Sequence, residues 1–213
     1  MCRAFTLVEL LVAIAIIAIL AGLALTALPA MRQRADQADA LAKIRTMGSA
    51  VLTYPADHDG RLPPLWPGQV LEYQAGRGGR IVTECAEYLG IDPEEGNYLV
   101  ASLMPRAYAR LTEPANKNAM RVYVMNTAVT NQGNVINPFG SVTTPGSPPT
   151  GNTPMAALTS AGGLWMMSTA DQLQANVAGA PWKGNAPAQP PLGNKRAIFR
   201  FDGGCELSDI AAP

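Results

Sequence analysis

The first part of the chain is a long run of apolar residues that predicts a membrane-crossing helix. No residue between Leu10 and Met31 is charged, and a helix needs about 20 mainly apolar residues to cross a bilayer core. The run is longer than the ~7–15 residues of the apolar core of a secretory signal peptide, which favours an anchor that stays attached. Because proline interrupts helical hydrogen bonding, we expect a kink or a short break between Leu25 and Pro29.

From Met31 to about Thr53 the pattern becomes amphipathic, and it predicts that the helix resumes there and ends near Tyr54. A helix with one apolar face needs a partner, and a sheet formed by the rest of the chain is the obvious one. The apolar positions that recur near helical spacing are Ala35, Ala38, Leu41, Ala42, Ile44, Val51 and Leu52.

The remaining residues carry signals for short elements joined by loops rich in Gly, Pro, Asn and Thr. A short helix is expected at Thr83–Leu89, with Thr83 as its cap and Gly90 as its stop. Strands are expected at Arg121–Met125 and Leu164–Met167, with a long loop at Gln132–Pro154.

The C-terminal residues predict a hairpin. Ala197–Phe201 alternates as a strand, Asp202-Gly203 supplies turn residues, and Cys205–Leu207 returns. The expected fold class is therefore α+β: a long N-terminal helix packed on a small antiparallel β-sheet head with long loops.

Glu9 stands directly before the uncharged run. A charged side chain at the centre of a bilayer costs ~2.5–3.5 kcal/mol on insertion scales, and less near the interface. Taken alone, Glu9 is most simply explained as a carboxylate at the level of the lipid headgroups.

Its neighbours change that interpretation. The order Phe5-Thr6-Leu7-Val8-Glu9, followed by an uncharged helix, resembles the prepilin signature of type IV pilins and type II secretion pseudopilins. The resemblance implies that a membrane peptidase cuts between Ala4 and Phe5 and methylates the new amino terminus of Phe5. It also implies that Glu9 takes part in subunit assembly by pairing with the Phe5 amine of a neighbouring subunit. The chain departs from the family in having Ala4 where Gly usually precedes the cut.

A second stretch, Tyr54–Pro64, resembles the segment after the first helix in pseudopilin-like proteins abundant in Verrucomicrobia and Planctomycetes. Asp57 and Asp59 in this stretch are weak candidates for a metal site, because they form only part of a calcium loop. A solvated turn is the favoured interpretation. The terminal hairpin also resembles that of the family, with Gly204 and Leu192 in the places of two histidines.

The resemblance implies a division into a leader at 1–4, a transmembrane and filament-core helix at 5–30, its amphipathic continuation at 31–54, and a periplasmic head at 55–213. It places the chain in the inner membrane as a single-pass protein, with a cytoplasmic N-terminus, before incorporation into a filament. The charges that flank the apolar run do not by themselves decide the orientation.

Three cysteines occur in the sequence. Cys2 would leave with the leader, so Cys85 and Cys205 remain in an extracytoplasmic head, where a disulfide is expected to form. Two free thiols are the alternative that the sequence leaves open.

The composition argues against several function classes. The formal net charge is zero, which speaks against a nucleic-acid partner. The sequence lacks the serine-elbow, P-loop, zinc-protease and Cys-x-x-Cys patterns, so we expect neither an enzyme nor a cofactor.

The expected function is that of a structural subunit that polymerises into a type II secretion pseudopilus or a type IV pilus-like filament. Its partners would be other pilin or pseudopilin subunits, the prepilin peptidase, the inner-membrane assembly platform and membrane lipid. The alternative is a membrane-tethered binding module, adhesin-like or a minor tip subunit.

Overall fold

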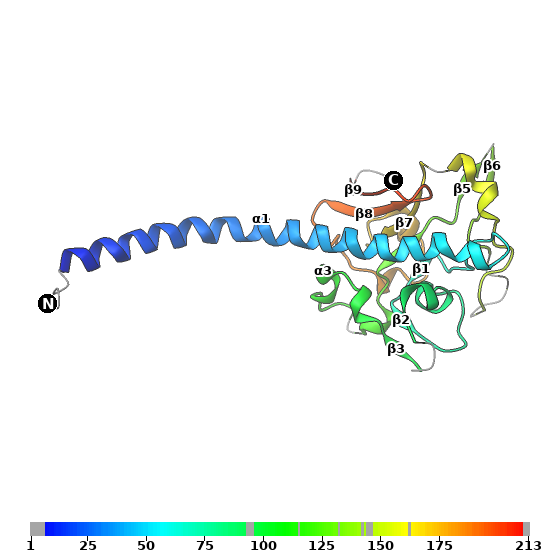
Figure 1. Cartoon of the computed structure of the whole chain (residues 1–213), viewed down its shortest axis with the longest axis horizontal. Helices are drawn as coiled ribbons and strands as arrows, with labels where there is room; N and C mark the ends of the chain where they lie inside the picture. Colours follow the sequence, from blue (N-terminus) through cyan, green and yellow to red (C-terminus); the bar gives the residue numbers. More distant parts are fainter. Residues whose placement is uncertain are drawn as a thin grey trace. The chain divides into compact units, whose positions relative to one another are not determined.

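A single helix, α1 (Leu7–Thr53), carries both the apolar run and the amphipathic segment (Figure 1). The chain stays helical through Pro29, so of the kink or short break expected there, the break does not occur. A proline inside a helix removes one donor and crowds the carbonyl four residues earlier, but the alanines and leucines on either side are strong helix formers. The helix ends where expected, and a 3-10 turn, η1 (Tyr54–Asp57), follows it.

The computed structural model describes residues 7–92, 96–114, 116–131, 133–141, 143, 147–161 and 163–210. The chain divides into two compact units, Met1–Ala35 and Asp36–Pro213. The expected boundary at residue 30 falls a few residues before this division.

The centre of the second unit is a five-stranded antiparallel sheet with the order β1-β4-β7-β8-β9. Its strands are β1 (Gly68–Gln69), β4 (Tyr123–Met125), β7 (Trp165–Thr169), β8 (Lys195–Arg200) and β9 (Cys205–Asp209). Since α1 and this sheet are both present, the α+β class is confirmed.

The remaining elements are short. Two further antiparallel pairs are β2 (Glu72–Tyr73) with β3 (Tyr98–Leu99), and β5 (Val129–Asn131) with β6 (Asn134–Ile136). The short helices are α2 (Ile81–Glu84), α3 (Arg106–Ala109) and α4 (Ala175–Ala178). Further 3-10 turns are η2 (Glu87–Leu89), η3 (Ala101–Leu103), η4 (Lys117–Ala119), η5 (Met155–Ala161) and η6 (Lys183–Asn185).

The part of α1 from Asp36 onward packs on one face of the sheet (Figure 1). Each of its buried positions has another three or four residues away, so that together they form one helix face. They are Asp36, Ala40, Ile44, Met47, Gly48, Ala50 and Val51. The partner sheet expected for the amphipathic segment is thereby confirmed.

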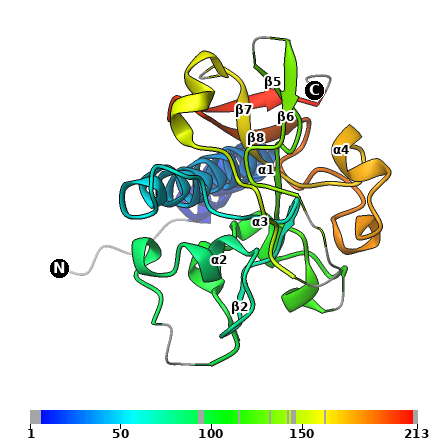
Figure 2. The same ribbon diagram turned by 90° about the vertical axis from the view of Figure 1, so that its right-hand side faces the viewer.

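A smaller apolar cluster covers the other face of the sheet, on the side of α4 (Figure 2). Val124 belongs to this cluster, whereas its strand neighbours Tyr123 and Met125 belong to the main core, because successive side chains of a strand point to opposite faces. Trp165 and Trp182 pack against the smaller cluster.

The strands and the hairpin expected near the C-terminus are present. The hairpin of β8 and β9 turns at Asp202-Gly203, where Gly203 has a φ of 85°. The strand predictions for Arg121–Met125 and Leu164–Met167 correspond to β4 and β7. The expected loop at Gln132–Pro154 is partly wrong, because it contains β6.

The helix expected at Thr83–Leu89 forms differently. α2 starts at Ile81 with Arg80 in the cap position, so Thr83 is not the cap. The backbone N–H of Ile81 donates to Oε1 of Gln69, at 2.8 Å. The Gln69 side chain from β1 thus accepts the hydrogen bond that a capping residue next to the helix would otherwise accept. Gly90 ends the following turn with a φ of 64°, as expected.

Candidate assembly surface

The described part of the first unit exposes large apolar side chains from Leu7 to Met31. Among the described residues, α1 contains the one stretch long and apolar enough, by length and composition, to cross a membrane. Its large exposed apolar residues are Leu7, Val8, Leu10, Leu11, Val12, Ile14, Ile16, Ile17, Ile19, Leu20, Leu23, Leu25, Leu28 and Met31. Water disfavours such a surface by about 25 cal/mol per Å², and an apolar patch of this extent marks contact with lipid or protein.

Small residues interrupt this surface at helical spacing. Ala18 and Gly22 stand four residues apart, and a Cβ added at Gly22 would meet no atom within 4 Å. Small residues at this spacing allow two helix backbones to approach closely in lipid. The surface therefore suits helix–helix packing as well as lipid.

Glu9 lies in the first turn of α1 and is exposed. The amino-terminal end of a helix carries a partial positive charge that favours a carboxylate at this position. The other residues of the expected processing site, Ala4 and Phe5, lie outside the described residues.

Asp57 and Asp59 lie in the turn after α1. The hydroxyl of Tyr88 donates to Oδ2 of Asp57, at 2.8 Å, and Asp59 has a φ of 49°, a left-handed conformation that turns favour in Asp. No group of three metal-ligating side chains occurs among the described residues. The arrangement supports a turn.

His58 is held by Tyr54 in the same turn. The two rings stack with centroids 3.6 Å apart, and Nδ1 of His58 lies 2.9 Å from the carbonyl oxygen of Tyr54. Burial raises the pKa of Tyr54 to about 12. These contacts keep the turn closed against the end of α1.

Cys85 and Cys205 are free thiols, so the disulfide expected between them is not formed. Cys85 is fully buried in the main core, whereas Sγ of Cys205 lies 3.6 Å from the carbonyl oxygen of Leu41 on α1. Burial raises the pKa of both thiols. Neither cysteine therefore suits nucleophilic chemistry, which requires the thiolate.

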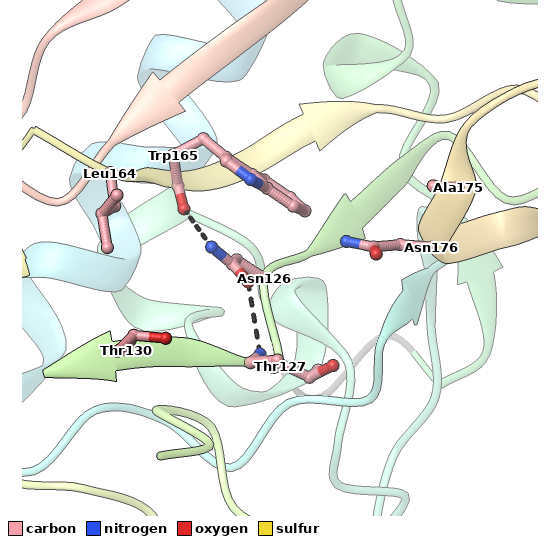
Figure 3. Close-up of a pocket in the computed structure, with 8 residues that line it drawn as sticks. Asn126, Thr127, Thr130, Leu164, Trp165, Ala175 and Asn176 are labelled. Atoms are coloured by element: carbon pink, nitrogen blue, oxygen red, sulfur yellow. Dashed lines mark hydrogen bonds between the residues drawn. The ribbon is translucent and has the colours of Figure 1, made fainter. Parts of the chain in front are cut away.

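An open pocket of about 410 Å³ lies in the second unit (Figure 3). Its lining includes Asn126 after β4, Trp165 of β7 and Asn176 of α4. Sequence reasoning singled out none of them by role. Trp165 falls in a predicted strand, but no pattern in the sequence near Trp165 predicts that it lies beside Asn176 of α4.

The comparisons with known proteins concern the N-terminal segment. Residues 1–25 match the family model of the prokaryotic N-terminal methylation motif. No curated protein and no solved structure matches the chain. The first 25 residues, including Glu9, are therefore a prepilin-type cleavage and methylation segment.

Proposed function

We propose that the chain is a structural subunit that polymerises into a type II secretion pseudopilus or a type IV pilus-like filament after cleavage before Phe5. One observation carries the proposal: the methylation motif at residues 1–25 opens a helix whose apolar side chains are exposed on every side. The motif supports a pilin-like or pseudopilin-like precursor and favours a structural subunit over an enzyme.

Assembly would exchange one apolar environment for another. In the inner membrane, lipid covers the apolar part of α1, and in the filament the same helices of other subunits would cover it. Close packing at small residues such as Ala18 and Gly22 would replace the lipid contacts.

Glu9 would set the axial register of this packing. Paired with the methylated amine of Phe5 in a neighbouring subunit, its carboxylate would lie in an environment of low dielectric constant, where opposite charges attract strongly. A subunit displaced along the filament axis would lose this pair, so the pair would favour one register.

The proposal also implies a membrane orientation and a set of partners. The N-terminus would be cytoplasmic and the head periplasmic, and the prepilin peptidase, the inner-membrane assembly platform and membrane lipid would be partners before incorporation. Other pilin or pseudopilin subunits would be the partners afterwards.

Processing is tested by co-expressing the chain with a prepilin peptidase and determining the N-terminus of the mature protein by mass spectrometry. We expect a methylated N-terminus at Phe5. The matched variant Ala4→Gly, which restores the residue usual in the family, should be cleaved at the same bond at least as fast. A product that retains Met1 beside an active peptidase would overturn the assignment.

The register argument is tested with Glu9→Ala. This variant should insert into the membrane normally but fail to enter filaments, as measured in sheared-filament fractions. Thr26→Ala is the control, because Thr26 is an uncharged residue of the same helix whose hydroxyl donates to the carbonyl oxygen of Leu23 at 2.9 Å, so this variant should assemble like the wild type. If Glu9→Ala assembles equally well, Glu9 does not set the register.

A second candidate function is a membrane-tethered binding module, adhesin-like or a minor tip subunit. The pocket beside Trp165 favours this candidate, because its lining combines an indole ring with the polar side chains of Asn126 and Asn176, as small-ligand sites do.

A further inference from the structure

The pocket lies where β4 ends, β7 begins and α4 passes (Figure 3). Its volume of about 410 Å³ falls within the range of ~300–1,000 Å³ typical of small-ligand sites. None of the described residues that line it carries a charge. A ligand with a net charge would find no opposite charge among them, so the lining selects for a neutral ligand.

Asn126 lines the buried part of the pocket. Its Nδ2 donates to the carbonyl oxygen of Trp165, at 2.9 Å, and its Oδ1 accepts from the backbone N–H of Ala128, at 3.2 Å. The residue is only 6% exposed. Asn126 therefore ties the end of β4 to the start of β7, and it fixes the backbone that carries Trp165.

Trp165 and Asn176 line the pocket from different sides. Figure 3 shows the indole ring of Trp165 and the amide of Asn176 extending toward the same space from different elements. Trp165 is half-buried and packs against the smaller apolar cluster, so its ring is held in place. Asn176 is exposed on α4.

Several polar groups of the lining are available to a ligand. Within the described part of the chain, the Asn176 amide and the hydroxyls of Thr127 and Thr130 make no hydrogen bond to other residues. An amide offers donors and an acceptor together, and a hydroxyl offers both in one atom. These groups match a ligand that is itself rich in hydroxyls.

These features together define the ligand class. A sugar ring has one face of C–H groups, which pack on the electron-rich face of an indole, and a rim of hydroxyls, which pair with amides and hydroxyls. We propose that this pocket binds a neutral hexose unit of a glycan, with Trp165 as the stacking platform and Asn176 as the hydrogen-bonding wall. The open mouth of the pocket leaves room for the glycan chain to continue into solvent.

A peptide is the competing neutral ligand, and the sheet topology disfavours it. Peptides often bind by adding a strand to a free sheet edge. β4 and β7, which flank the pocket, are interior strands of the order β1-β4-β7-β8-β9, so a peptide cannot add to either of them. Among the described strands of the lining, only β5, a strand of 3 residues that carries Thr130 and pairs with β6 alone, has an unpaired edge. The proposal concerns the second unit alone and does not rest on filament assembly.

Binding is tested with the full-length chain in a zwitterionic detergent, because detergents with sugar headgroups would compete for the site. The probes are neutral disaccharides of glucose, galactose and mannose, sialylated and sulfated counterparts, and neutral tripeptides. Tryptophan fluorescence and calorimetry measure binding. We expect saturable binding of at least one neutral disaccharide, and weaker or no binding of its charged counterparts.

Variants locate the site. Trp165→Ala should weaken binding roughly tenfold, which is about what one aromatic contact contributes, and Trp165→Phe should retain part of the affinity. Asn176→Ala changes only an exposed side chain, so its loss of binding cannot be attributed to misfolding. Leu173→Ala is the control, since Leu173 is exposed outside the pocket lining and its replacement should leave binding unchanged.

The proposal is overturned if no neutral saccharide binds at tens of millimolar, if the tripeptides bind instead, or if Trp165→Ala and Asn176→Ala bind like the wild type. The outcome is separable from filament assembly. Glu9→Ala should lose assembly and keep sugar binding, whereas Asn176→Ala should keep assembly and lose sugar binding.

Discussion

The ring of Phe199 on β8 lies directly against the backbone of Gly48 on α1. A Cβ placed at position 48 would lie 2.3 Å from Cδ1 of Phe199, closer than any two non-bonded carbons approach. Both residues are buried. This contact explains a glycine inside a helix, where it costs about 1 kcal/mol relative to alanine, because only glycine lets α1 lie so close to the sheet.

Gly48→Ala should therefore destabilise the fold. Overpacking a core costs about 1–3 kcal/mol, and the gain of about 1 kcal/mol in helix propensity offsets only part of it. We expect a net loss of up to about 2 kcal/mol in the free energy of unfolding, measured by urea unfolding of the full chain in detergent with tryptophan fluorescence as the signal. Ser49→Ala, at the adjacent exposed position, is the control. A midpoint for Gly48→Ala above that of Ser49→Ala, as helix propensity alone would give, would show that Phe199 moves aside without cost.

Asp171 and Arg196 form a buried two-pronged ion pair that joins the loop after β7 to β8. Nε of Arg196 donates to Oδ2 of Asp171 at 2.6 Å, and Nη2 donates to Oδ1 at 2.9 Å. The side chain of Arg196 is only 3% exposed and that of Asp171 only 1%. Removing one partner of such a pair leaves a buried charge and costs about 3–5 kcal/mol.

Asp171→Ala or Arg196→Met alone should therefore lower the free energy of unfolding by about that amount, whereas the double variant should lose much less than the sum. The double-mutant cycle is measured by urea unfolding. Strict additivity of the two single losses would mean that the pair does not act as a unit.

Cys85 and Cys205 should differ in access to alkylating reagents. Cys85 is fully buried and Cys205 half-buried, and the raised pKa of both thiols leaves little thiolate at neutral pH. We expect iodoacetamide to label Cys205 slowly in the folded chain and Cys85 only after unfolding, as measured by peptide mass spectrometry. Cys205→Ser should abolish native labelling of the head. A peptide that joins Cys85 to Cys205 under non-reducing conditions would contradict the free-thiol arrangement.

The predictable parts of the fold were those that rest on local chemistry. The turn at Asp202-Gly203 and the helix stop at Gly90 follow from residues adjacent in sequence, and both were confirmed. The start of α2 was not predictable, because its first N–H is satisfied by Gln69 from a distant strand. Local pattern likewise favoured a disulfide, although Cys205 instead contacts the backbone of Leu41.

The same distinction applies to the candidate sites. The methylation segment is contiguous, so residue order alone identified it. The pocket joins Asn126, Trp165 and Asn176 through strand pairing and the placement of α4. No periodicity connects residues so far apart in the chain, and only the folded sheet brings them together.

Glu84 should make stability depend on pH. Its Oε1 accepts from the backbone N–H of Gly79 at 2.7 Å, but burial raises its pKa above the usual range, against the opposing effects of that bond and of His58. The folded state therefore holds a proton at pH values where the unfolded state has released it. Stability from this group is greatest below the ordinary glutamate pKa of about 4.3 and declines as pH rises through the raised pKa.

Glu84→Gln should remove this decline, since glutamine stays neutral and keeps an oxygen for Gly79. The variant should thus gain stability relative to the wild type as pH rises from about 4 and level off once Glu84 is ionised, as measured by urea midpoints between pH 4 and 8. Glu87→Gln makes the same charge change at an exposed neighbour, so it controls for net charge. If both variants follow the same pH profile, the effect comes from overall charge, and the burial of Glu84 beside Gly79 does not govern its ionisation.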